Sequence, residues 1–221
     1  MVDLRAFLGA SDLYFIRHGE SEGNRDAIIQ GRNPSQLTVN GRRQALAAGE
    51  WFRDKSLDHV LTSPLLRASE TARIIAGTAG VGTVEEAEEL SEIDTGIFSG
   101  LSFIQARMLH PVEWRSFQVE SWEGVPGAER IEDLLARAER AWARLREYVA
   151  QGKRRLLCVT HSGFLQWIIR STLGGTSWMP LFASSENCAV SHLNIMNATN
   201  DGADPGHLAR WMMINASVHV R

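Results

Sequence analysis

Two short apolar runs, at residues 13–16 and 156–159, each lead within two residues to a histidine. A continuous apolar run of this length, bounded by polar residues, is typical of a strand buried on both faces of a sheet. The residues that follow are Arg17-His18-Gly19 in the first case and His161-Ser162-Gly163 in the second, where glycine allows a sharp turn. The chain is therefore constrained towards an α/β fold whose strand ends carry polar groups, the usual place for ligands in such sheets.

Strand-like and helix-like segments alternate along most of the chain. The apolar patterns predict strands at residues 13–16, 58–62, 82–86, 154–160, 188–196 and 207–215. They predict helices at residues 39–55, 64–78, 101–109, 131–150 and 164–173, with Pro64 at the first position of the second helix. This alternation predicts a three-layer sandwich: a mostly parallel sheet with helices on both faces, and an antiparallel strand near the C-terminal edge beside the polar turn at 198–206.

Residues 93–130 break this alternation, because glycine and proline punctuate them repeatedly. They are predicted to form a loop and helix insert, a lid within a single domain that spans residues 1–221. Trp114, Phe117 and Trp122 are clustered in this insert. Such aromatic residues form either a wall of a substrate site or a small separate core, and the sequence leaves both readings open.

The composition excludes several classes of partner. The net charge of −3 disfavours a general nucleic-acid or membrane-surface binder, so any anion site must be a local cluster of cations. No apolar run approaches the length of a membrane span and the N-terminus lacks an apolar signal segment, which predicts a cytoplasmic protein. Cys158 and Cys188 lie in apolar runs and are expected to be buried free thiols. Histidine and cysteine spacings predict neither a metal site nor a bound cofactor.

Several cationic side chains are predicted to meet at the carboxyl end of the sheet. Arg17 has the planar fork that grips an oxyanion, and His18 can act as a nucleophile, a base or a ligand. Arg67 lies one turn into a helix that begins where another strand ends. His161 precedes the start of a further helix, whose free N–H groups favour a bound phosphate. Each of these residues alone is also compatible with a structural role.

A carboxyl group near these cations would supply the proton that a leaving oxygen needs. Glu92, in Leu90-Ser91-Glu92, is the first candidate. Asp94 is its rival, and residue chemistry alone does not exclude Glu20 or Glu22. The long polar loop at residues 19–36 is also expected to be functional, because ordered loops of this length usually are.

Five sequence blocks, in this order, resemble the histidine phosphatase superfamily, the branch that includes cofactor-dependent phosphoglycerate mutase and small bacterial phosphatases. The first is Arg17-His18-Gly19-Glu20-Ser21 with Asn24, followed by Gln30-Gly31, residues 37–41 and Gln44-Ala45. The others are residues 63–68 with Thr71-Ala72, Leu90-Ser91-Glu92 with Gly96 and Gly100, residues 126–129 with Arg137, and residues 159–163. The similarity covers roughly residues 13–195.

The resemblance implies a role for each matching residue. His18 would be the nucleophile that takes the phosphoryl group, and its attack requires a neutral ring nitrogen fixed by a partner at the other nitrogen. Arg17, Arg67 and His161 would hold the phosphate oxygens, and Glu92 would donate and then accept the proton. The residues implied to bind substrate with neutral groups are Ser21, Asn24, Gln30, Gly31 and Ser162.

The departures from the family pattern concern the choice between phosphatase and mutase. Mutases typically carry Arg-His-Tyr after the acid and Gly-Asn after the second histidine, whereas this chain has Ile93-Asp94-Thr95 and Ser162-Gly163. These differences favour a metal-independent phosphomonoester hydrolase that acts on a small phosphorylated metabolite. The chain also differs from common phosphatases, with Ile97-Phe98-Ser99 in place of x-Trp-Glu and Arg130 in place of serine.

Two other functions stay open at this point. One is a phosphoglycerate mutase-type phosphotransferase, and the other is a non-catalytic module that binds phosphate on the same fold. A homodimer is also possible, because the insert and the C-terminal strand pair each offer a surface for one.

Overall fold

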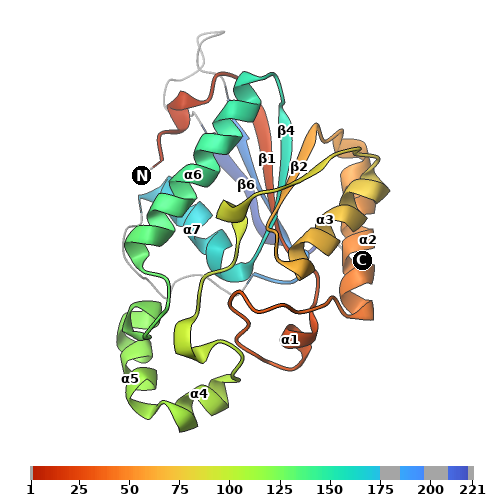
Figure 1. The fold of residues 1–221 in the computed structure, drawn as a ribbon. Coiled ribbons are helices and arrows are strands. Elements are labelled where there is room, and N and C mark those ends of the chain that lie inside the picture. Colours follow the sequence, from red (N-terminus) through yellow and green to blue (C-terminus); the bar gives the residue numbers. More distant parts are fainter. Residues whose placement is uncertain (1, 175–184, 197–208, 219–221) are drawn as a thin grey trace.

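The computed structural model describes residues 2–174, 185–196 and 209–218 (Figure 1). Within these ranges one sheet has the strand order β3-β2-β4-β1-β5-β6. The strands are β1 (Ser11–Arg17), β2 (His59–Thr62), β3 (Val84–Glu86), β4 (Arg155–Thr160), β5 (Val190–Ile195) and β6 (Ala209–Ala216). The four strands β1 to β4 pair in parallel, whereas β5 is antiparallel to β1 and β6 is antiparallel to β5. The predicted mostly parallel sheet with an antiparallel C-terminal edge is confirmed; the turn predicted at 198–206 lies outside the described residues.

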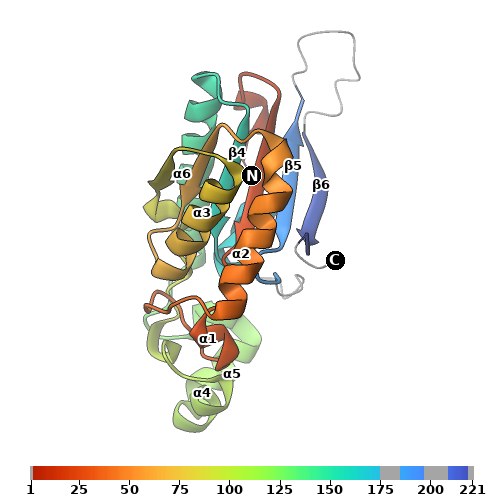
Figure 2. The ribbon, with the colours of Figure 1, turned by 90° about the vertical axis from the view of Figure 1, so that its right-hand side faces the viewer.

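Helices cover both faces of this sheet, as predicted (Figures 1 and 2). Helices α2 and α3 pack on one face, and α6 and α7 pack on the other. The described helices are α1 (Glu22–Arg25), α2 (Val39–Phe52), α3 (Leu66–Ala79), α4 (Phe103–Leu109), α5 (Pro111–Glu120), α6 (Ile131–Ala150) and α7 (Ser162–Leu173). Short 3-10 turns lie at η1 (Leu4–Ala6), η2 (Arg53–Lys55), η3 (Glu88–Leu90), η4 (Gly96–Phe98) and η5 (Ser121–Gly124).

The middle residues of the central strands are apolar, as suits strands buried on both faces. In β1, Leu13 and Phe15 join the core beneath α6 and α7, whereas Tyr14 and Ile16 join the core beneath α2 and α3. The parallel register places Arg17 opposite Thr160. The two apolar runs therefore end side by side, and their histidines leave the sheet at the same edge.

Most predicted helices agree with the structure to within a few residues, and α6 has the predicted bounds. The start of α3 was predicted wrongly: the helix begins at Leu66 and Pro64 lies outside it. The Ser63 hydroxyl accepts a hydrogen bond from the Leu65 N–H at 3.2 Å, and Leu65 keeps an extended backbone. A serine-stabilised bend therefore occupies the place where the sequence suggested a first helical turn.

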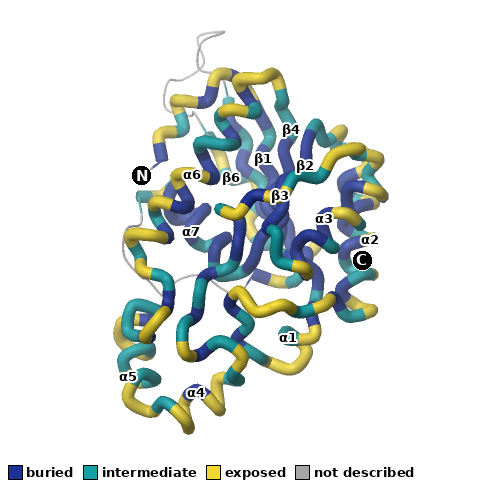
Figure 3. Tube along the Cα trace, viewed as in Figure 1, coloured by how far each residue is buried: buried dark blue, intermediate teal, exposed yellow. Residues whose placement is uncertain are grey.

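The insert at residues 93–130 projects beyond the carboxyl ends of the strands and carries α4 and α5 (Figures 1 and 2). The sequence predicted α4 but not α5. The insert has its own small core, centred on the fully buried Phe98, and its outer surface is largely exposed (Figure 3). Both cysteines are buried and free, as expected. None of the described helices is long and apolar enough to cross a membrane.

Candidate active site

A cavity of about 360 Å³ opens at the carboxyl ends of β1 and β4, between the sheet and the insert. Its walls come from the loop after β1, from α3, from the segment around Glu92, from the insert and from the start of α7. The described residues that line it are Arg17, His18, Asn24, Ile28, Ile29, Gln30, Gly31, Arg67, Glu92, Ile93, Thr95, Phe103, Trp122, Ser162, Gly163 and Gln166. Four of the five sequence blocks singled out above contribute to this lining, whereas the block at residues 126–129 with Arg137 does not.

The His18 ring is held in one tautomer. Its Nδ1 lies 2.7 Å from the Gly19 carbonyl oxygen, so Nδ1–H donates and Nε2 carries the lone pair. Arg67 Nε donates to this Nε2 at 3.2 Å. Burial lowers the pKa of His18 well below its usual value, and the charges of Arg67 and Arg17 lower it further. The Gly19 carbonyl is the partner that the sequence left unnamed, and the ring is neutral with Nε2 available.

Gly19 itself permits this arrangement. A Cβ atom at this position would lie 2.5 Å from the Gly41 carbonyl oxygen, which belongs to the first turn of α2. The helix therefore approaches the turn after β1 so closely that no side chain fits, and glycine is required here for space.

Two arginines lie near His18, of which Arg67 is buried and Arg17 is half-buried. Arg67 donates from Nη2 to the Gly31 carbonyl at 2.7 Å and from Nη1 to the Asn33 carbonyl at 3.0 Å. Burial lowers the pKa of Arg67 to about 10, so the side chain stays charged at neutral pH. Arg17 donates from Nη1 to the Ser185 carbonyl, and its buried Nε has no hydrogen-bond partner among the described residues. The two side chains place positive charge around the His18 ring, and Arg17 retains a donor without a partner among the described residues.

His161 lies directly behind His18, with 5.0 Å between the ring centroids. Its Nε2 is 2.8 Å from the Ser63 hydroxyl, while its buried Nδ1 has no partner among the described residues. Burial, followed by the charge of Arg67, lowers the pKa of His161 well below its usual value. Ser63 was not predicted as a site residue, although its place at the end of β2, in Ser63-Pro64, was the available signal.

Among the four candidate carboxylates, Glu92 is the one found in the described lining of the cavity. Its Oε1 accepts hydrogen bonds from the N–H groups of Ile93 at 2.9 Å and Phe164 at 3.0 Å, and its Oε2 accepts one from Gly163 at 3.2 Å. The carboxylate therefore lies on the N-terminus of α7, where the helix dipole favours negative charge. A Cβ atom on Gly163 would lie 2.5 Å from Glu92 Oε1, so a side chain at this position would displace the carboxylate.

The other three carboxylates serve local structure. Glu20 accepts hydrogen bonds from the Thr38 hydroxyl and, at 3.2 Å, from Asn40. Asp94 accepts one from the Gly96 N–H at 3.0 Å, and Glu22 is exposed in the first turn of α1. The structure thus distinguishes Glu92 from the three other candidate proton donors, which residue chemistry alone did not exclude.

Asn24, Gln30, Gly31 and Ser162 line the cavity, as their assignment required. Ser21 is buried behind them, with its hydroxyl 3.0 Å from Asn24 Oδ1 and 2.9 Å from Gln30 Oε1. Asn187 was missed: its amide donates to the His18 carbonyl at 3.0 Å and to Asn24 Oδ1 at 3.1 Å. No local motif marks Asn187, because it reaches the site only through the pairing of β5 with β1.

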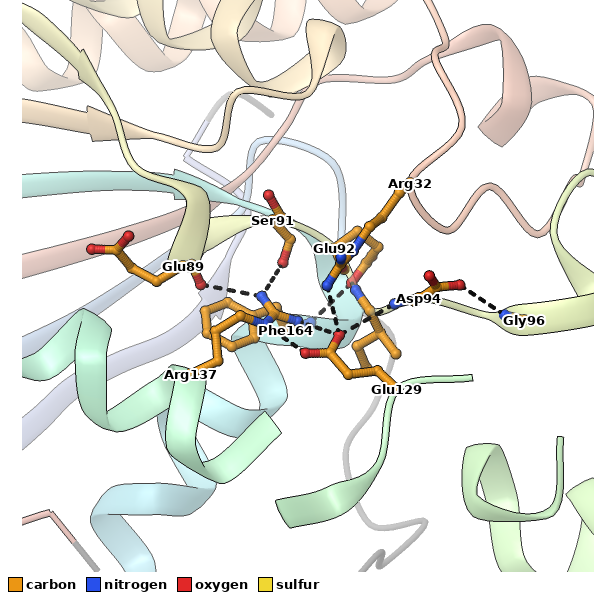
Figure 4. Close-up of polar contacts among 10 residues, drawn as sticks. Arg32, Glu89, Ser91, Glu92, Asp94, Gly96, Glu129, Arg137 and Phe164 are labelled. Atoms are coloured by element: carbon orange, nitrogen blue, oxygen red, sulfur yellow. Dashed lines mark hydrogen bonds and ion pairs between the residues drawn. The ribbon is translucent and has the colours of Figure 1, made fainter. Parts of the chain in front are cut away.

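A buried ion pair holds the segment that carries Glu92 (Figure 4). Arg137 from α6 binds Glu129 through two contacts of 2.7 Å and donates to the carbonyl oxygens of Glu89 and Ser91. Glu129 also accepts from the Asp94 N–H at 3.3 Å and from Arg32 at 3.1 Å. Because these contacts fall on both sides of Glu92, the pair fixes the backbone from which the acid projects.

The same arginine also reaches the start of α7. Its guanidinium lies 3.9 Å from the centroid of the Phe164 ring, and the Phe164 N–H is one of the donors to Glu92. Arg137 thus connects the end of the insert, the acid-bearing segment and the helix that holds the carboxylate.

Known proteins share this arrangement. Residues 13–203 match the sequence profile of the histidine phosphatase superfamily (branch 1). The chain is 32% identical over 184 residues to a protein of Salmonella choleraesuis (strain SC-B67) named probable phosphoglycerate mutase GpmB, covering 82% of this chain and 84% of that protein.

Solved structures agree with the sequence comparison. The alpha-ribazole phosphatase of Shigella flexneri superposes with a TM-score of 0.79 at 27% identity, covering 93% of this chain and 96% of that one. The phosphoglycerate mutase of Bacillus anthracis str. Sterne shares the fold alone, with a TM-score of 0.77 at 19% identity and coverage of 97% and 96%. The chain belongs to the histidine phosphatase superfamily.

Proposed function

We propose that this protein is a metal-independent phosphomonoester hydrolase that works through a phosphohistidine on His18. Relatives with phosphatase and with mutase names support the coarser statement that the chain is a phosphoryl-transfer enzyme. The observation that carries the finer proposal is the state of His18. Its ring is neutral, its proton lies on Nδ1, and Nε2 lies beside Arg67, while the charge of Arg17 also acts on the ring.

In the first step His18 Nε2 attacks the phosphorus atom, so an N–P bond forms as the P–O bond to the alcohol breaks. The departing oxygen takes a proton from Glu92, which enters this step in its protonated form. The transition state is loose, so most of the catalysis comes from fixed positive charge around the phosphoryl oxygens. Arg17 and Arg67 supply that charge, and the unpartnered Nδ1 of His161 offers a further hydrogen bond.

In the second step a water molecule attacks the phosphohistidine from the side that the alcohol has left. Glu92, now ionised, accepts the proton of that water. The N–P bond breaks, inorganic phosphate leaves, and His18 returns to its neutral state with the lone pair on Nε2. Two in-line displacements at one phosphate cradle thus replace a single direct attack by water.

A mutase is the second candidate, and the name of the Salmonella relative favours it. A mutase returns the phosphoryl group to another hydroxyl of a substrate that stays bound, rather than to water. We place it second because Ile93-Asp94-Thr95 and Ser162-Gly163 stand where mutases carry other residues. Conversion of 3-phosphoglycerate to 2-phosphoglycerate faster than phosphate release, stimulated by a bisphosphorylated primer, would establish the mutase instead.

The same proposal includes the remaining predictions from the sequence. The chain acts as one domain over residues 1–221, the insert at 93–130 serves as its lid, and the substrate is a small phosphorylated metabolite. A homodimer and a cytoplasmic location stay predictions.

The proposal is tested by phosphate release from aryl and alkyl phosphates, with trapping of labelled enzyme. We expect an acid-labile, base-stable phosphoryl label on the wild-type protein and turnover unaffected by a chelator. His18→Ala should lower turnover by at least about 10⁴-fold, because the covalent step is lost. His110→Ala is the matched control, since this histidine lies between α4 and α5 away from the cavity lining. An active enzyme that never carries an acid-labile phosphate would contradict the mechanism.

A further inference from the structure

The lining of the cavity includes two chemically different groups of side chains. His18, Arg17, Arg67 and Glu92 serve the phosphoryl group in the proposed function. A second group is apolar and comes from the loop after α1 and from the insert. The described residues of this apolar wall are Ile28 and Ile29 from the loop after α1, Ile93 beside the acid, and Phe103 and Trp122 from the insert.

The charges of the lining balance a phosphate and leave little for a second anion. Among the described lining residues the charged side chains are Arg17 and Arg67, together with Glu92 when it is ionised. In the first proposed step Glu92 is protonated, so the two arginines balance a phosphate ester dianion and no positive charge is left over. A carboxylate or second phosphate further from the cradle would lie against the apolar wall, where an unpaired charge is strongly disfavoured.

An arginine that is adjacent in sequence to the lining, Arg32, does not supply a positive charge for a second anion. Arg32 follows Gly31, but its Nη2 donates to Glu129 at 3.1 Å and its Nε donates to the Glu92 carbonyl at 3.3 Å. It is not part of the described lining. Its guanidinium is therefore committed to the network that holds the acid-bearing segment.

The aromatic part of the wall is supported from behind. Trp122 packs on Phe117 with 4.8 Å between ring centroids, and Phe103 packs edge-on against Trp114 at 6.0 Å. Phe103 is nevertheless 50% exposed, so an apolar ligand would remove part of its surface from water. Trp114 and Phe117 pack against the small core centred on Phe98, whereas Trp122 both packs against that core and lines the cavity.

We propose that the substrate is a phosphate monoester of an uncharged, largely apolar alcohol, with a ring or branched chain that packs on Phe103 and Trp122. This inference rests on the proposed hydrolase and names its substrate class. Polyanionic esters such as phosphoglycerates would be poor substrates.

The test compares 2-phenylethyl phosphate with 3-phosphoglycerate. Both are esters of primary alcohols, so similar leaving oxygens isolate the effect of the group that meets the wall. We expect kcat/KM to favour 2-phenylethyl phosphate by about tenfold or more, because hydrophobic pockets discriminate by about 10- to 200-fold.

Substitutions in the wall locate the origin of this preference. Phe103→Ala and Trp122→Ala should each lower kcat/KM for 2-phenylethyl phosphate by about tenfold. Inhibition by inorganic phosphate and turnover of 3-phosphoglycerate should change less than twofold. Phe103→Arg should shift the preference towards 3-phosphoglycerate, since it adds a cation at the rim. Met108→Ala is the control, because Met108 lies on the same helix, is 74% exposed and does not line the cavity.

The outcomes distinguish a failure of the proposed substrate class from a failure of the proposed hydrolase. Turnover of 3-phosphoglycerate at least as fast as that of 2-phenylethyl phosphate would overturn the substrate class and leave the hydrolase standing. Equal losses for both esters in the wall variants, with weakened phosphate inhibition, would also overturn it, because the wall would then be structural. Release of no phosphate from either ester or from 4-nitrophenyl phosphate would defeat the hydrolase and the inference together.

Discussion

The phosphate cradle and the helical insert meet at one cavity but are built in opposite ways. In the cradle, polar groups are buried and held by the backbone: His18 and Arg67 are 2% and 1% exposed, and backbone carbonyls accept hydrogen bonds from both. In the insert, large apolar side chains face outward on two short helices. The exposed apolar side chains of α4 and α5 are Phe103, Ile104, Met108, Leu109, Val112 and Val119.

The difference suits the cradle and the insert to different roles in the proposed reaction. Buried, backbone-held polar groups have little freedom to move, which suits charge stabilisation that must be in place before the reaction. The side chains of Phe103 and Trp122, which the insert brings to the cavity, are apolar, and apolar surface accepts substitution more easily than a polar network does. The residues proposed to transfer the phosphoryl group thus lie at the strand ends, and the proposed selectivity for the alcohol comes from the insert.

The largest expected effect comes from breaking the connection between the two regions. Arg137→Met should lower the free energy of unfolding by about 3–5 kcal/mol, because it leaves the buried Glu129 without its main partner. The carbonyl oxygens of Glu89 and Ser91 also lose a donor, so the Glu92 segment should loosen and kcat should fall. Urea unfolding and steady-state kinetics measure the two effects.

Arg140→Met is the matched control, because Arg140 lies three residues further along α6 and is exposed. It should change stability by less than about 0.5 kcal/mol. An Arg137→Met protein with normal kcat would show that the ion pair stabilises the fold without positioning the acid.

The same comparison explains which parts of the fold and of the candidate site could be predicted from the sequence. Arg17, His18, Arg67 and His161 follow strands or lie in the first turn of a helix, so local patterns were enough to place them at one edge of a sheet. Glu92 lies in the irregular segment between η3 and η4, where the family resemblance singled it out. The tautomer of His18 was not predictable, because it depends on the direction of the Gly19 carbonyl. That direction belongs to a turn packed closely against α2 in the folded protein. Asn187 and the ion pair of Arg137 with Glu129 depend on contacts between distant segments. In the insert, α5 lacks a strong apolar periodicity, so tertiary packing determines it.

A smaller effect is expected from a change confined to the cradle. Gly163→Ala places a Cβ atom 2.5 Å from Glu92 Oε1 and must displace the carboxylate. We expect kcat for alkyl phosphates to fall by about 10- to 100-fold, within the range of a lost general acid. Turnover of 4-nitrophenyl phosphate should fall less when chemistry limits it, because its leaving group needs no proton.

Gly77→Ala provides the control for this substitution. Gly77 lies within α3, and a Cβ atom there would have no neighbour within 4 Å. Its kinetics should match the wild type, and its stability should rise by up to about 1 kcal/mol, since alanine favours the helix. Equal losses for alkyl and aryl esters in Gly163→Ala would mean that the glycine serves the phosphate cradle rather than the acid.

The smallest effect is the pH dependence of stability, which should come from the cradle and not from the insert. His18 and His161 have pKa values well below normal in the folded protein because both are buried. In the unfolded chain each binds a proton near pH 6.5, so the unfolded state holds more protons below that pH. Their contribution is complete above about pH 6.5 and is lost as the pH falls towards their folded pKa values. Each contributes at most about 1.4 kcal/mol per pH unit.

Urea unfolding between pH 8 and pH 5 measures this slope, in a range above the usual titration of most carboxylates. His161→Asn should remove up to one proton from the slope between pH 6.5 and pH 5. His110→Asn, in the insert, should leave the slope as it is in the wild type. If both variants keep the wild-type slope, His161 is not held neutral by burial, and the contrast between a rigid polar cradle and a permissive apolar insert loses its electrostatic basis.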